Sequence, residues 1–94
     1  MSRRAAKADS NQPKIVQAFE KLGCSVQHLH MVGGGCPDIV VGVNGVTVLV
    51  EIKTDTGYLT KDQKYFFETW RGYAVIVHSV EEAIDLVNQI RSKP

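Results

Sequence analysis

Residues 33–53, GGGCPDIVVGVNGVTVLVEIK, decide the predicted fold of this chain. Two runs of β-branched residues flank the dipeptide Asn44-Gly45, and both residues of that dipeptide accept the positive φ of a tight hairpin turn. The pattern predicts a β-hairpin with a two-residue turn and with strands over residues 38–43 and 46–54. The acidic and basic side chains of the stretch then fall at the open end of the hairpin.

The predicted turn fixes which residues face each other. Val43 pairs with Val46, and counting outward places Asp38 opposite Glu51 in a non-hydrogen-bonded pair, whose Cα atoms lie about 4.5 Å apart. Because side chains alternate along a strand, Lys53 lies on the same face as Glu51. Two carboxylates and an ammonium group are therefore expected to gather at one place.

Two carboxylates this close repel each other unless something neutralises them, and a divalent cation would do so. Mg2+ fits because it is a hard ion that takes one or two carboxylates, waters and phosphate oxygens. We expect Asp38 and Glu51 to bind it, with the carbonyl of Ile52 as a further ligand. Lys53 is expected to hold or deprotonate the attacking water in phosphodiester hydrolysis. The plainer interpretation is that Asp38 is a turn or strand-start residue after Pro37, and that Glu51 and Lys53 are solvated residues on an exposed face.

Two elements are predicted before the hairpin. Ser10 or Asn11 caps a helix that has Pro13 in its first turn and stops at Gly23. Residues 24–31 alternate well enough for a strand, and the three glycines that follow predict a loop. The apolar side of the helix carries Ile15, Phe19 and Leu22.

Three elements are predicted after the hairpin. Thr60 and Gln63 form a capping box that opens a helix ending at Gly72, and Ser79 and Glu82 form another before the last helix. Residues 73–78 are a short apolar run, as expected for a strand buried on both faces. We expect the aromatic residues of the first of these helices to lie mainly in the core, and the last helix to turn one apolar side to it. The aromatic residues are Phe66, Phe67 and Trp70. The apolar side of the last helix consists of Ala83, Ile84, Val87 and Ile90.

The predicted order α-β-β-β-α-β-α requires a mixed central sheet flanked by helices, an α/β architecture. Ninety-four residues suit a single domain over residues 1–94. The net charge of +1 argues neither for nor against nucleic acid. Residues 1–10 form either a flexible basic arm or an ordinary frayed terminus. The basic residues of this segment are Arg3, Arg4 and Lys7.

No apolar run approaches the roughly 18 residues of a membrane span, and the first residues lack the apolar core of a signal peptide. We therefore expect a cytoplasmic protein with no membrane partner, in which both cysteines are reduced thiols. The ligand types also allow a zinc site, although the spacing matches no common pattern. Its ligands would be Cys24, His28, His30 and Cys36.

Pro37-Asp38, followed by Glu51-Ile52-Lys53 at the end of a β-branched strand, resembles the PD-(D/E)xK pattern of restriction-endonuclease-like nucleases. The predicted element order resembles the core of that fold. Two further segments are similar to the VRR-NUC (virus-type replication-repair nuclease) domain, and the resemblance covers nearly the whole chain from Gln12 onward. These segments are Gly57-Tyr58-Leu59-Thr60 leading to Gln63, and Gly72-Tyr73-Ala74-Val75.

The resemblance implies a metal-dependent nuclease site. Asp38 and Glu51 would bind Mg2+ or Mn2+, and Lys53 would be catalytic. Gln63 would face the site from its helix, although its place in the capping box is a sufficient reason for its presence. Family members often have an acidic residue near the start of the first helix, a position that Gln12 or, one face further along, Glu20 would take here.

The resemblance also implies the substrate. Short free-standing members, in bacteria and phages, act as homodimers on branched DNA such as four-way junctions or flaps, in the context of DNA repair. The glycine loop and the aromatic helix are candidates for the dimer interface. A catalytically silent DNA-binding or interaction module on the same fold is the alternative.

Overall fold

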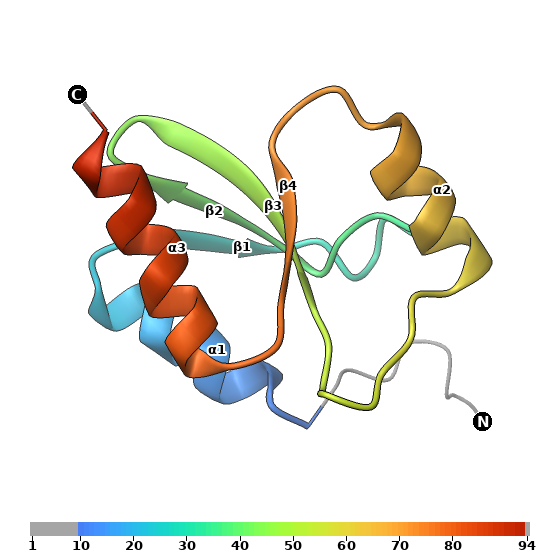
Figure 1. The fold of residues 1–94 in the computed structure, drawn as a ribbon, viewed down its shortest axis with the longest axis horizontal. Helices are drawn as coiled ribbons and strands as arrows, with labels where there is room; N and C mark the ends of the chain where they lie inside the picture. Colours follow the sequence, from blue (N-terminus) through green and yellow to red (C-terminus); the bar gives the residue numbers. More distant parts are fainter. Residues whose placement is uncertain (1–9, 94) are drawn as a thin grey trace.

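The computed structural model describes residues 10–93, so the predicted basic arm at Arg3, Arg4 and Lys7 lies outside the described residues. The predicted order of helices and strands and the α/β class are confirmed (Figure 1). The elements are α1 (Gln12–Lys21), β1 (Ser25–His28), β2 (Ile39–Val43), β3 (Val46–Ile52), α2 (Lys61–Thr69), β4 (Ala74–Val77) and α3 (Val80–Ser92).

The four strands form one mixed sheet in the order β1-β2-β3-β4, in which only β3 and β4 are parallel. β1 is shorter than predicted, because residues 30–32 form a turn. The prediction that residues 73–78 are buried on both faces is wrong. β4 is an edge strand in which Val77 alone is buried, so its apolar run reflects packing on one face.

The hairpin has the predicted turn and register. Asn44 and Gly45 have φ of 56° and 79°, and the ladder runs from the Val43–Val46 pair to the Ile39–Val50 pair. The next residue whose backbone would face β3 is Pro37, two residues before β2. Because Pro37 has no N–H to donate, the regular ladder does not extend to it. Both strands are consequently shorter at this end than predicted, and the hairpin opens there.

The core lies between the sheet and two helices, α1 and α3, which pack against each other on one face (Figure 1). The predicted apolar side of α3 is partly wrong: Leu86 is buried and Ile84 is exposed. Leu86 follows the buried Ala83 by three residues and so shares its face, whereas Ile84 is turned by about 100° from Ala83. The main buried side chains are Ile15, Phe19, Ile39, Val41, Val48, Val50, Ile52, Val87 and Ile90.

The start of α1 is tied to the carboxyl ends of β3 and β4. Asn11 occupies the N-cap position, yet its side chain makes no capping hydrogen bond, contrary to prediction. Its Nδ2 instead donates to the carbonyls of Lys53 (3.3 Å) and His78 (2.9 Å). The amide group has two N–H donors and satisfies both carbonyls at the strand ends, which fixes where α1 begins relative to the sheet.

The second predicted capping box is only half formed. Ser79 Oγ accepts a hydrogen bond from the N–H of Glu82, as predicted. The Glu82 carboxylate accepts from the N–H of His78 at 2.8 Å, one residue before the position that a capping box requires.

α2 stands apart from α1 and α3, beside the connection between β1 and β2 (Figure 1). Its capping box at Thr60 and Gln63 is confirmed. The expectation that its aromatic residues lie in the core is wrong, because no residue of α2 is buried and Trp70, just after it, is 48% exposed. Within residues 10–93 no helix combines the length and apolar character of a membrane span.

Candidate active site

Asp38 lies where the two strands of the hairpin part. Its Oδ2 accepts a hydrogen bond from the N–H of Ile52 at 2.8 Å, and its carbonyl accepts one from the N–H of Leu29 at 2.8 Å. The side chain thus accepts the hydrogen bond that a backbone carbonyl would accept if the ladder continued. Because side chain and backbone are both held, the carboxylate is fixed next to the last residue of β3.

Glu51, on β3, is only 1% exposed, so its charge requires nearby compensation. Lys53 Nζ lies 3.6 Å from Glu51 Oε2, and Gln63 Nε2 donates a hydrogen bond to the same oxygen at 3.0 Å. The Lys53 side chain is itself largely buried, which strengthens the attraction between the two charges. The structure therefore brings Lys53 and Gln63 into direct contact with Glu51.

Gln63 performs both of the roles that the sequence left open. Its Oε1 accepts from the N–H of Thr60 at 2.9 Å, and its own N–H donates to Thr60 Oγ1 at 3.1 Å, which completes the capping box. Because the amide oxygen is used at the helix start, the amide nitrogen points to Glu51. The capping box thereby orients the side chain that contacts the buried carboxylate.

Cys36 lies beside the two carboxylates. Burial, and then the negative charges of Glu51 and Asp38, raise the pKa of its thiol. The thiol is therefore protonated at neutral pH and is neither a nucleophile nor a thiolate ligand. Both carboxylates are close enough to Cys36 to act on its thiol.

Gly35 allows α2 to approach this end of the hairpin. It has a φ of +80°, and a Cβ at this position would lie 2.4 Å from the carbonyl oxygen of Asp62 and 2.9 Å from the backbone nitrogen of Gln63. No side chain fits at such distances from backbone atoms. The role of the glycine loop as a dimer contact stays a prediction. One of its glycines, Gly35, packs against the first turn of α2, on which Gln63 lies.

The start of α1 adds two buried amide oxygens, one of them on Gln12, the residue that the family resemblance names at this position. Gln12 is only 9% exposed, and neither its Oε1 nor the Oδ1 of Asn11 has a hydrogen-bond partner among residues 10–93. Glu20, the other candidate on this helix, is exposed and about 12 Å further along α1. Asn11 binds the Lys53 carbonyl, so the start of α1, which carries both residues, lies at the carboxyl end of β3.

These donors fit a hard cation. Asp38 and Glu51 supply carboxylates, and the carbonyl of Ile52 points to the same side as its N–H, toward Asp38. Mg2+ or Mn2+ needs only one or two carboxylates when water and phosphate complete the shell. The described part of the chain has no group of three or more His, Cys, Asp or Glu side chains placed for a metal, so a cation here would also need amide, carbonyl or water oxygens.

The alternative zinc site is contradicted. β1 and β2 pair from Ser25–Gly42 to His28–Ile39, so Cys24 and Cys36 lie beyond opposite ends of that pair. Four paired residues separate them by more than about 12 Å, several times a zinc–ligand distance. Burial also raises the pKa of the Cys24 thiol, which disfavours a thiolate ligand.

A solved structure described as a "VRR_NUC domain" is similar to this fold. The TM-score is 0.68 and the sequence identity is 26%, over 82% of this chain and 89% of that one. This chain is a VRR-NUC-like domain. The resemblance noted from the sequence is thereby confirmed, and the restriction-endonuclease-like arrangement of the elements is consistent with it. No family model and no curated protein matches the sequence.

The similarity to a VRR-NUC domain bears on what the site can do. A VRR-NUC-like domain is a nuclease-type domain, and DNA is accordingly the partner class that the fold indicates. Lys53 and Gln63 meet Glu51 at the hairpin end, with Asp38 beside the last residue of β3. Acidic, basic and amide groups thus meet where the hairpin strands part.

Replacing Gly35 by Ala tests whether the glycine loop positions α2. Gly34→Ala is the matched control, because Gly34 also has a positive φ but a Cβ there would meet nothing within 4 Å. Both variants carry a backbone cost of about 1–2 kcal/mol. We expect only Gly35→Ala to increase amide hydrogen exchange throughout α2, measured by NMR. Equal protection of α2 in the two variants would show that Gly35 does not hold the helix.

Proposed function

We propose that this VRR-NUC-like domain is a Mg2+- or Mn2+-dependent endodeoxyribonuclease. The observation that supports the proposal most directly is the buried Glu51 carboxylate, in contact with Lys53 and Gln63, next to Asp38 at the end of the hairpin. Burying an acid is costly unless it is paired, and replacing one partner of such a pair leaves the other charge uncompensated. A buried acid beside a second acid and a lysine is typical of a site that handles a charged substrate.

The residues divide the work between them. Asp38, Glu51 and the carbonyl of Ile52 hold the cation, with Gln12 Oε1 as a further oxygen donor. The bound metal supplies a Lewis acid for the phosphoryl group and a source of activated water. Lys53 holds the attacking water and offsets the negative charge that develops on the phosphate in the transition state. Gln63 orients the Glu51 carboxylate by its hydrogen bond.

We further propose that the substrate is branched DNA, a four-way junction or a flap, cut by a homodimer. Each chain carries one set of the three residues Asp38, Glu51 and Lys53, whereas resolution of a junction needs two symmetric cuts. The aromatic residues on α2 and just after it support this proposal as a contact surface for the second copy. Phe66 and Trp70 stack there with ring centroids 5.0 Å apart, yet neither is buried. Exposed aromatic pairs of this kind are enriched at interfaces.

Cleavage of a panel of four-way junction, flap, nicked and linear duplex DNA with Mg2+ tests the activity. We expect the branched substrates to be cut, and Asp38→Asn, Glu51→Gln and Lys53→Met each to lower the rate at least about 100-fold. Binding of the junction in Ca2+ should persist in all three variants. Glu20→Gln, which removes an exposed acid elsewhere on the surface, is the control and should cut normally.

The outcomes separate three possibilities. Equal rates for linear duplex and junction would contradict a branched substrate while leaving the nuclease in place. Junction binding without cleavage by the wild type, in either metal, would instead make the domain a silent DNA-binding module. Unchanged cleavage by the Lys53→Met variant would remove that residue from the mechanism.

Sedimentation equilibrium tests the dimer. Trp70→Glu places a charge on the aromatic face of α2, and we expect it to convert a wild-type dimer into a monomer. Tyr65→Glu is the matched control, because Tyr65 is 67% exposed and lies on the opposite side of the helix, about 140° away from Trp70. A monomeric wild type contradicts the dimer itself. A Trp70→Glu variant that stays dimeric assigns the interface elsewhere.

A further inference from the structure

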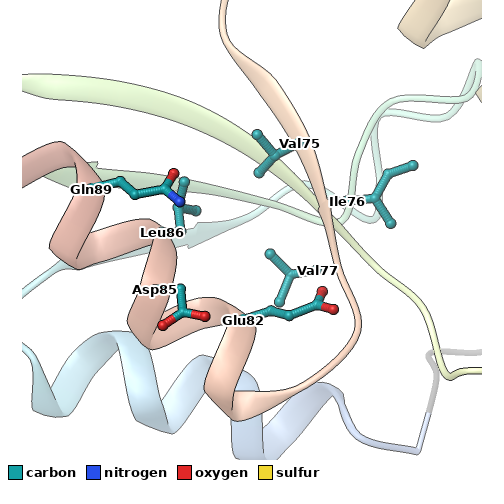
Figure 2. Close-up of a pocket in the computed structure, with 7 residues that line it drawn as sticks. All are labelled: Val75, Ile76, Val77, Glu82, Asp85, Leu86 and Gln89. Carbon is teal, nitrogen blue, oxygen red and sulfur yellow. The ribbon is translucent and has the colours of Figure 1, made fainter.

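The groove between β4 and α3 is a surface that the nuclease site does not use (Figure 2). Val75 and Val77 point from β4 toward α3, where Leu86 completes an apolar floor, and Ile76 points away. The polar rim is formed by Glu82, Asp85 and Gln89 on α3. The volume of about 270 Å³ is below the roughly 300–1,000 Å³ of small-molecule sites, so a few side chains fit it better than a cofactor.

The edge of β4 presents unpaired backbone groups beside this groove. The carbonyls of Tyr73 and Val77 accept hydrogen bonds from β3, at 3.0 and 3.1 Å. Because backbone groups alternate along a strand, the N–H and C=O groups of Ala74 and Ile76 point to the open side. No strand within residues 10–93 pairs with that side. The sequence Ala-Val-Ile-Val carries no proline or charge of the kind that protects edge strands.

The rim of the groove is negatively charged. Asp85 forms no salt bridge with any described residue. Hydrogen bonds from the backbone and side chain of His78 lower the pKa of Glu82, so its carboxylate is ionised at neutral pH. An acidic rim repels DNA phosphates, and it also disfavours a second copy, since twofold pairing of two β4 strands would bring two acidic rims together. A basic peptide is attracted to the acidic rim and brings no second acidic rim with it.

We propose that the β4 edge and its groove form a docking site for an extended peptide of a partner protein, in which Lys or Arg flanks alternating apolar residues. The peptide adds a fifth strand through the backbone groups of Ala74 and Ile76. Every second side chain enters the apolar groove, and the basic residues meet Asp85 and Glu82. The proposal is independent of nuclease activity, because none of these residues belongs to the nuclease site.

Fluorescence anisotropy with labelled nonapeptides tests this docking site. The probes share an alternating Val and Thr core and carry either Lys or Glu at both ends; a third has Lys ends and a central proline. We expect the wild type to bind the first probe at least about fivefold more tightly than the other two. Backbone amide shifts of Ala74 and Ile76 should accompany binding in NMR spectra.

Charge reversal provides the matched variants. Asp85→Lys should weaken the Lys-ended probe about fivefold and strengthen the Glu-ended one. Glu81→Lys makes the same charge change on the same helix, outside the groove, and should alter both affinities less than twofold. Equal affinity for the three probes, or equal effects of the two variants, would overturn the proposal. Self-association of the wild type that Ala74→Pro abolishes would assign the edge to a second copy instead.

Discussion

The two-residue turn at Asn44 and Gly45 is the constraint from which the site follows. With both residues at positive φ, only one register of β2 and β3 is compatible with the turn, and a slip by one residue would exchange the buried and exposed faces of the strands. The observed register buries Val41, Val48 and Val50 on one side. It leaves Asp38 and Glu51 as the next pair beyond the last ladder rung, so the chemistry depends on a turn at the far end of the hairpin.

Proline and glycine then shape what the register brings together. Pro37 has no N–H to donate to β3, so the regular ladder stops there. The Asp38 carboxylate accepts a hydrogen bond from the N–H of Ile52, which holds the acid in place. Gly35 lets the first turn of α2 approach, and the capping box of that turn directs Gln63 to Glu51. A nuclease site needs acids held close together against their repulsion. Here the backbone of a short hairpin and one helix start supply that restraint.

The hairpin, the element order and the contact of Lys53 with Glu51 could be predicted because local turn chemistry and strand alternation determine them. The packing of the other elements around the hairpin could not be predicted in this way. β4 has the composition of a doubly buried strand but lies at an edge, because an apolar run does not report how many faces are covered. Asn11 has the identity of a cap and instead binds Lys53 and His78, since competing acceptors 42 and 67 residues away are invisible in sequence. Aromatic residues such as those of α2 suit either a core or an interface, so the sequence does not distinguish a buried helix from an exposed one.

The central claim is that the hairpin register builds a cation site. Thermal unfolding in the absence of DNA, with and without Mn2+, tests it most directly, because a ligand that binds only the folded state raises Tm. A matched comparison uses Asp38→Asn, which keeps an oxygen for the Ile52 N–H, and Glu20→Gln, which lies outside the site. We expect Mn2+ to raise the Tm of the wild type and of Glu20→Gln but not that of Asp38→Asn. No rise in the wild type, or an equal rise in all three proteins, would contradict a cation site built by the hairpin register.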